Sequence, residues 1–174
     1  MLEAFYATER GSLEDATING GFDLHPELVW VDLIAPSQDE QEWVLDAYKQ
    51  NLPTLKSLED ISSSARFYRD DDGILHISTY FLTKNKNYQV EDESDDSSNM
   101  LGTIQTVAFI LHKDRLFTLR GEKLVAFRAF RARARRNDYD IEYKDPTWIL
   151  LGLLEAKLDE LADILEDIHK DLES

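Results

Sequence analysis

The stretch VAFILHKDRLFTLR, residues 107–120, contains two apolar runs of strand length separated by the polar pair Lys113-Asp114. This pattern predicts two strands, Thr103 to Leu111 and Arg115 to Leu119, connected by a tight turn. Strands joined by so short a connection pair antiparallel, because parallel neighbours need a long crossover. The stretch therefore predicts a hairpin within a β-sheet.

A helix is predicted directly after this hairpin, from Glu122 to Asn137, because Leu124, Phe127 and Phe130 recur at helical spacing and can face inward. Its outer face is basic, with Arg128, Arg131, Arg133, Arg135 and Arg136. Nucleic-acid binding is disfavoured, since the two aromatic rings lie on the opposite face and the chain as a whole is acidic. We expect the basic face to dock on acidic elements of the same chain or on a neighbouring subunit.

The N-terminal part of the chain predicts strands followed by a helix. Residues 2–9 alternate weakly, a short strand is expected between residues 11 and 22, and residues 28–33 form a compact apolar run. Ser37 and Glu40 then have the spacing of a capping box, in which each side chain accepts a hydrogen bond from the other residue's backbone. A helix is therefore predicted over residues 38–50.

A second helix is predicted from Pro53-Thr54, with Leu55, Leu58 and Ile61 on one apolar face and the acidic pair Glu59-Asp60 beside it. A serine run at 62–64 ends this helix. The turn Asp71-Asp72-Gly73 then joins predicted strands over residues 65–69 and 74–83 as a second hairpin. Residues 84–102 are very polar, and we expect an extended, mobile loop there because neighbouring like charges repel.

The last segment predicts a long helix, which Asp145 caps and Pro146 begins. Apolar residues recur in it at alternating intervals of three and four, which is a heptad seam. The seam consists of Leu151, Leu154, Leu158, Leu161, Leu165, Ile168 and Leu172. No Gly or Asn ends the pattern, so we expect the helix to continue past Ser174 in a longer protein.

Composition excludes several classes of function. Among the 174 residues, 35 acids face 19 bases, and the formal charge of −16 repels nucleic acid and anionic lipid while it favours cations. The absence of cysteine excludes disulfides, thiolate metal sites and a thiol nucleophile, and it fits a reducing cytoplasm. The four histidines, His25, His76, His112 and His169, show no metal-ligand spacing. With no phosphate-binding glycine loop either, we predict that the chain is not an enzyme.

Acidic clusters are the most informative candidates for a site. On the last helix Asp159, Asp163, Glu166, Asp167 and Asp171 lie three or four residues apart, off the leucine seam. Like charges at this spacing destabilise a helix, and a hard divalent cation bound through oxygens would relieve the repulsion. From the pattern alone, a solvated acidic face is the simpler interpretation, both here and for the pair Glu59-Asp60.

The order of these features resembles the cytoplasmic N-terminal domain of the CorA family of magnesium and cobalt transporters. The resemblance is carried by VWVDLIAPSQDE (29–40), LEDISSSARFYRDDDGILHI (58–77), VAFILHKDRLFTLR (107–120), LVAFRAFRARAR (124–135) and ILLGLLEAKLDELADILEDIHKDLE (149–173). It implies an α/β fold in which a mixed, largely antiparallel sheet is sandwiched between helices. Residues 1–144 would form the cytoplasmic domain, and residues 145–174 would begin the long helix that leads to a membrane domain absent from this sequence.

The resemblance also implies a function and a site. The family forms homopentamers at the cytoplasmic face of the inner membrane, and divalent ions bound between subunits favour the closed state. The regulatory and transported ion would be Mg²⁺, with Co²⁺ or Ni²⁺ as further ions. The sensing acid of the family corresponds to Asp60, with Glu59 beside it, and a further family acid corresponds to Glu155. This chain alone would stay soluble, monomeric or weakly associated.

Two other interpretations compete with the Mg²⁺-sensing one. The zinc-transporting branch shares the fold, and the Gly-Met-Asn pore signature that would help to separate the two branches is not in this sequence. A free-standing acidic adaptor that binds a partner helix through the leucine seam is the other alternative.

Overall fold

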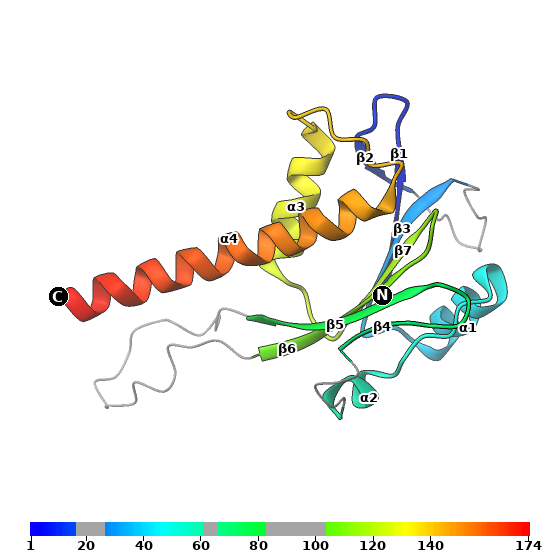
Figure 1. Ribbon diagram of the computed structural model, residues 1–174, viewed down its shortest axis with the longest axis horizontal. Helices are drawn as coiled ribbons and strands as arrows, with labels where there is room; N and C mark the ends of the chain where they lie inside the picture. The colour runs from blue at the N-terminus through cyan, green and yellow to red at the C-terminus, as the bar shows by residue number, and fades with distance from the viewer. Residues whose placement is uncertain (17–26, 61–65, 83–103) are drawn as a thin grey trace.

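The computed structural model describes residues 1–16, 27–60, 66–82 and 104–174, and its centre is one seven-stranded sheet (Figure 1). The strands are β1 (Leu2–Ala7), β2 (Leu13–Asp15), β3 (Leu28–Ile34), β4 (Phe67–Arg69), β5 (Leu75–Leu82), β6 (Ile104–Leu111) and β7 (Leu116–Arg120). The helices are α1 (Gln38–Tyr48), α2 (Leu55–Glu59), α3 (Val125–Arg136) and α4 (Pro146–Glu173).

The sheet is mixed but largely antiparallel, with the strand order β2-β1-β3-β7-β6-β5-β4. Only the central pair β3 and β7 runs parallel, and every other neighbouring pair is antiparallel. The hairpin predicted at residues 107–120 is confirmed as β6–β7, where Leu111 pairs with Leu116. The parallel pair is possible because the β4–β6 segment and two helices intervene between its strands.

Helices cover the two faces of the sheet, which confirms the predicted fold class (Figure 1). One hydrophobic cluster joins α3 and the first half of α4 to the sheet, through Phe127, Phe130, Ile149 and Leu153. The other cluster joins α1 and α2 to the opposite face, through residues such as Val44 and Leu58. The distal half of α4 extends beyond the sheet.

The capping hydrogen bonds predicted at the N-terminal ends of α1 and α4 are present. Ser37 and Glu40 make the reciprocal capping box of α1, with the Glu40 amide 3.2 Å from Ser37 Oγ. Asp145 caps α4 by accepting a hydrogen bond from the Thr147 amide at 3.0 Å. These bonds satisfy amides that have no partner within the helix, and so they fix where each helix begins.

Most predicted strands and helices are confirmed, with bounds that shift by a few residues. α3 begins at Val125 and not at Glu122, and β7 extends to Arg120. The predicted loop at 84–102, the serine run at 62–64 and the apolar position Ile61 lie outside the described residues.

A buried polar network in the centre of the sheet was not predicted. Arg120 on β7 donates to both oxygens of Asp32 on β3, at 3.2 and 2.6 Å. Thr118 donates to Asp32 at 2.7 Å and accepts from the Trp30 indole at 2.9 Å. Asp32 and Arg120 are 0% and 1% exposed, so each charge depends on the other for compensation. The guanidinium also lies 4.1 Å from the centre of the Phe127 ring, which ties α3 to this network.

Candidate metal-binding and interaction surfaces

The acidic pair Glu59-Asp60 lies at the end of the short helix α2. Thr54 caps this helix by accepting a hydrogen bond from the Ser57 amide at 3.1 Å, and Asp60 is the C-cap residue that follows Glu59. Leu58 is buried against the sheet face formed by residues such as Ala108 and Ile110. Because Leu58 points into the core, the two residues that follow it are directed to solvent.

Both carboxylates of this pair are exposed, and neither forms a hydrogen bond or ion pair with another residue that the structure describes. Two adjacent carboxylates in this state retain their full capacity as oxygen ligands. Such ligands suit Mg²⁺, which is usually held by one or two protein carboxylates together with several waters.

Glu155 lies on the outer side of α4, in the half of the helix that packs on the sheet. The neighbouring Leu153 and Ala156 are buried, while Glu155 is exposed. Its charge acts on Tyr143: burial raises the pKa of that phenol, Arg133 lowers it, and Glu155 raises it. No hydrogen bond or ion pair to a described residue occupies the Glu155 carboxylate.

The single chain does not bring these three acids together. α2 belongs to the cluster on one face of the sheet and α4 to the cluster on the other, and they stand well apart in Figure 1. Within the described ranges no group of three or more His, Asp or Glu side chains is arranged to hold a metal ion. An ion that contacts both positions would therefore have to be shared between two chains.

The acidic face of α4 is partly compensated within the chain. Asp159 accepts from Arg133 on α3 at 3.3 Å, and Glu166 pairs with Lys170 at 2.7 Å. His169 and Glu173 lie 3.2 Å apart. Since part of the predicted repulsion is relieved without a metal, the solvated-face interpretation of this helix stays open.

The basic face of α3 docks in part on acids of the same chain, as predicted. Arg131 pairs with Glu3 on β1, Arg133 with Asp159 on α4, and Arg136 with Asp138. Arg128 and Arg135 are exposed and have no ion pair with a residue in the described part of the chain.

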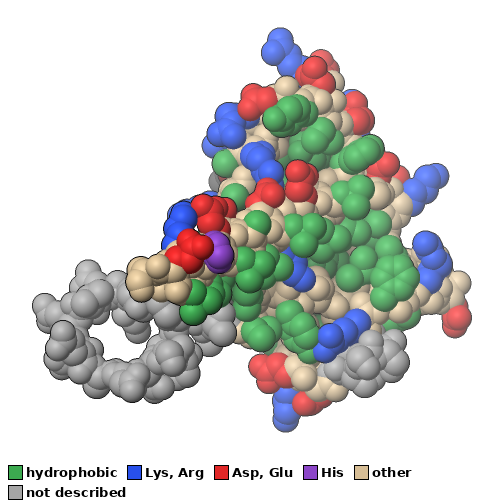
Figure 2. Space-filling view, turned by 60° about the vertical axis from the view of Figure 1, so that its left-hand side comes forward, with side chains coloured by type: hydrophobic (Ala, Val, Ile, Leu, Met, Phe, Trp, Pro, Cys, Tyr) green, Lys and Arg blue, Asp and Glu red, His purple; other side chains and the backbone are tan. Residues whose placement is uncertain are grey.

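A large apolar surface lies open beside α4. The heptad residues Leu151, Leu158, Leu165 and Leu172 are 49%, 64%, 65% and 80% exposed. The distal half of α4 extends beyond the sheet (Figure 1), and the first half packs on the sheet through a different face. That face contains Ile149, Leu150, Leu153 and Ala156 and was not predicted. On β4, Phe67 is 68% exposed and pairs with Ile77 of β5. Figure 2 shows hydrophobic side chains gathered over much of this side of the molecule.

Two histidines connect loops to interior strands of the sheet. His76 donates to Asp70 at 2.8 Å and stacks on Tyr68, and this hydrogen bond holds the pKa of Asp70 below its usual value. His112 lies 2.6 Å from Gln50 Oε1, and burial, reinforced by the charge of Arg115, lowers the pKa of its imidazole. Both hydrogen bonds connect segments of the chain that contain neither the acidic pair Glu59-Asp60 nor Glu155. His25 lies outside the described residues.

None of the helices in the described ranges is both long and apolar enough to cross a membrane.

Comparison with protein families gives one extended match. The sequence model of the family described as "CorA-like Mg2+ transporter protein" matches residues 26–174 of this chain. The magnesium transport protein CorA of Pectobacterium atrosepticum is 43% identical over 152 residues, which are 84% of this chain and 42% of the relative. The protein of the same name from Escherichia coli K12 is 42% identical over 151 residues, 83% of this chain and 41% of the relative. The chain thus spans less than half the length of these curated relatives.

Three solved structures share the fold. The soluble domain of CorA from Methanocaldococcus jannaschii matches with a TM-score of 0.64 at 14% identity, over 99% of this chain and 62% of that one. Full-length CmaX matches with a TM-score of 0.62 at 17% identity, over 98% of this chain and 49% of that one. The ZntB cytoplasmic domain of Vibrio parahaemolyticus matches with a TM-score of 0.59 at 16% identity, over 95% of this chain and 62% of that one. At these identities the likeness concerns the fold alone.

Proposed function

The chain belongs to the CorA family of Mg²⁺ transporter proteins, and on that premise we propose that it is the regulatory, Mg²⁺-sensing domain of a divalent-cation transporter. The family is one of transporters and not of enzymes, in agreement with the prediction from sequence. Transport itself is part of the proposal, because the chain covers only 42% of its relative from Pectobacterium.

The observation that carries the proposal is the placement of Glu59, Asp60 and Glu155. All three carboxylates are exposed and without ion pairs to described residues, yet they lie on opposite faces of the sheet. Within the part of the chain that the structure describes, this arrangement forms no single-chain site. It suits a site between subunits, in which Glu59 and Asp60 of one chain approach an acid such as Glu155 of the next.

Electrostatics supplies the regulatory step. Each chain carries a formal charge of −16, so assembled copies repel one another. Divalent ions held between acids of neighbouring chains offset that repulsion and stabilise the arrangement that binds them. Loss of the ions at low Mg²⁺ shifts the population toward the arrangement without them, which is the open state.

The proposed assembly is a homopentamer at the cytoplasmic face of the inner membrane, reached through chain that follows residue 174. Residues 1–144 would act as the sensor and residues 145–174 as the beginning of its connection to the membrane part. The exposed leucines of α4 and the open face around Phe67 support burial in a larger assembly, since apolar patches of this kind usually mark interaction surfaces.

Mg²⁺ is the proposed ion for both sensing and transport, with Co²⁺ and Ni²⁺ as further transported ions. The curated relatives are magnesium transport proteins at 42–43% identity, whereas the likeness to the ZntB domain is at 16% identity. The zinc branch is therefore the weaker alternative. A free-standing adaptor would use the same exposed leucine seam and needs no ion.

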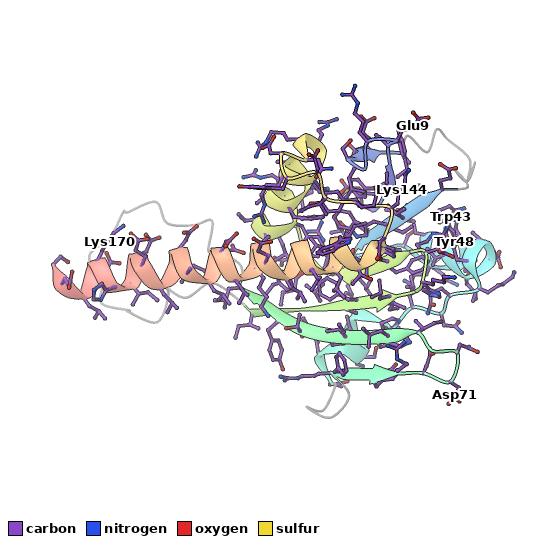
Figure 3. All side chains as sticks on the ribbon, turned by 45° about the horizontal axis from the view of Figure 1, so that its top comes forward. Glu9, Trp43, Tyr48, Asp71, Lys144 and Lys170 are labelled. Carbon is purple, nitrogen blue, oxygen red and sulfur yellow. The ribbon has the colours of Figure 1, made fainter. Side chains whose placement is uncertain are left out.

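The test is the Mg²⁺ concentration that protects the full-length transporter from proteolysis in detergent. Asp60→Asn removes one carboxylate ligand, and we expect the midpoint to rise by about tenfold, the equivalent of about 1.4 kcal/mol. The matched control is Asp71→Asn, which makes the same charge change in the exposed β4–β5 turn labelled in Figure 3. An unchanged midpoint in D60N, or an equal rise in D71N, would remove Asp60 from this role.

A further inference from the structure

A groove of about 550 Å³ lies between α3 and the strands β1 and β2, and Glu59, Asp60 and Glu155 take no part in it. It is lined by one face of α3, by strand residues and by two acids. Its lining includes Arg128, Arg131, Ala132 and Arg135 of α3, Phe5 and Leu13 of the strands, and the acids Glu3 and Asp15.

Three arginines line this groove from successive turns of α3. Arg131, in the middle, is fixed by its ion pair with Glu3 and lies 6.0 Å from the centre of the Phe5 ring. Arg128 and Arg135 are one turn before and one turn after it, on the same face of the helix. Both are exposed, and neither has an ion pair with a described residue.

Ordinary helix stabilisation does not account for this arrangement. Basic residues in the last turn of a helix interact favourably with the helix dipole, which covers Arg133, Arg135 and Arg136. Arg128 lies near the N-terminus, where a positive charge is unfavourable, and the first turn of α3 has neither an acid nor a side-chain cap. In a chain with a formal charge of −16, helix α3 still contains five arginines and no acid.

The groove has room for a compact ligand. Ala132, between the arginines, is small, and the floor formed by Phe5 and Leu13 is apolar and closed, each residue being 3% exposed. A volume of about 550 Å³ lies within the range of small-molecule sites. Arg131 neutralises Glu3, so among the described residues that line the groove Asp15 is the only unpaired carboxylate that would oppose an anion.

We propose that this groove, hereafter the α3 groove, binds a soluble compound with several linked phosphate groups. Guanidinium groups match phosphate oxygens in bidentate fashion, and three of them spaced along about 10 Å of helix fit a chain of phosphates better than a single small anion. Arg131 is held in place, while Arg128 and Arg135 close on the ligand from both sides. The site is independent of the proposed Mg²⁺ sensor, since it uses neither α2 nor α4.

The test is calorimetric titration of the 174-residue chain with inorganic tripolyphosphate and with ATP, without Mg²⁺ and at low salt. We expect saturable binding that weakens as salt is raised. The double variant Arg128→Gln/Arg135→Gln should lose at least about tenfold in affinity, because two charge-assisted contacts disappear. The control Lys123→Gln/Arg136→Gln makes the same charge change at two exposed positions outside the groove and should bind within about twofold of the wild type.

Circular dichroism of both double variants verifies that the fold is retained, and single R128Q and R135Q variants should each give an intermediate loss. Absence of saturable binding at millimolar tripolyphosphate would overturn the proposal, as would an equal loss in the control. Binding only to vesicles containing phosphatidylglycerol would assign the groove to lipid headgroups instead. A change in sedimentation of R128Q/R135Q without ligand, combined with no tripolyphosphate binding, would assign it to contacts between copies.

Discussion

The helix α2, which carries Glu59 and Asp60, has five residues, whereas α4, which carries Glu155, has 28. α2 is held to its face of the sheet by Leu58, its one buried residue. The first half of α4 is held to the other face by the buried residues Ile149, Leu150, Leu153 and Ala156. These residues belong to the same hydrophobic cluster as buried residues of α3. The two parts of the proposed ion site therefore differ in rigidity. The helix that positions Glu59 and Asp60 is held by fewer buried side chains than the helix that positions Glu155.

A difference in rigidity between α2 and α4 suits a domain that changes conformation when an ion binds. Elements with few buried contacts open at a lower free energy than the global unfolding of the domain, and moving parts are drawn from them. α4 and its sheet face would act as the fixed reference, while α2 adjusts when an ion binds or leaves. Substitutions on each side of the sheet can break this contrast between α2 and α4.

Removing the Asp32 carboxylate should cause the greatest loss of stability. Asp32→Ala leaves Arg120 buried without its counter-charge, and breaking such a pair costs about 3–5 kcal/mol. Chemical denaturation of D32A and of the control Asp46→Ala, at an exposed position on α1, measures the difference. A loss below about 1 kcal/mol in D32A would show that the network does not anchor the α3–α4 face.

Truncating the buried leucine that anchors each helix should affect the two faces of the sheet differently. Leu153→Ala is expected to cost about 3–4 kcal/mol and to increase amide exchange throughout α4 and the strands beneath it, since Leu153 is fully buried. Leu58→Ala should cost about 2 kcal/mol and increase exchange mainly in α2. Exchange that rises equally throughout the domain in L58A would contradict the view that α2 opens locally.

Glycine at position 152 permits the close approach of α4 to α3. A methyl group there would overlap the ring of Phe130, which is 1% exposed. Gly152→Ala should therefore destabilise the domain by about 1–3 kcal/mol, although alanine has the better helix propensity. Stabilisation of G152A in a thermal melt would show that α3 and α4 pack less tightly than described.

The smallest effect concerns the α1–α2 face and is a pH dependence. The pKa of His112 is lowered in the folded state, mainly by burial, so the folded protein favours the neutral ring. This contribution to stability is complete above the ordinary histidine pKa of about 6.5 and is lost as the pH falls below it. His112→Gln should flatten the fall in unfolding free energy between pH 7 and pH 5, measured by chemical denaturation at each pH. An equally steep fall in H112Q would contradict this assignment.

The sequence predicted the parts of the fold that depend on local spacing. The capping box at Ser37 and Glu40, the β6–β7 hairpin and the inward face of α3 follow from hydrophobic periodicity and helix-end chemistry. The parallel pairing of β3 with β7 and the Asp32–Arg120 pair could not be predicted, because they join residues 86 and 88 positions apart. On α4 the leucine heptad predicted one apolar face, whereas the helix packs on the sheet through Ile149, Leu150, Leu153 and Ala156.

The candidate site was predicted by resemblance and not by residue pattern. Glu59, Asp60 and Glu155 are acids on exposed helix faces, and spacing alone does not distinguish them from solvated side chains. What the structure adds is their separation to opposite faces of the sheet. The α3 groove was missed because its three arginines line it together with strands from the N-terminus, a pairing that the sequence does not reveal.

The central claim, that acids of two chains share an ion, can be tested most directly by cross-linking. This chain has no cysteine, so Ser57→Cys on α2 and Leu158→Cys on α4 can be introduced into a full-length transporter with any other cysteines removed. Because α2 and α4 lie on opposite faces of one chain, a disulfide between these positions reports two different subunits. We predict cross-linked oligomers in Mg²⁺ that disappear in chelator; equal cross-linking with and without Mg²⁺, or none in Mg²⁺, would contradict the account.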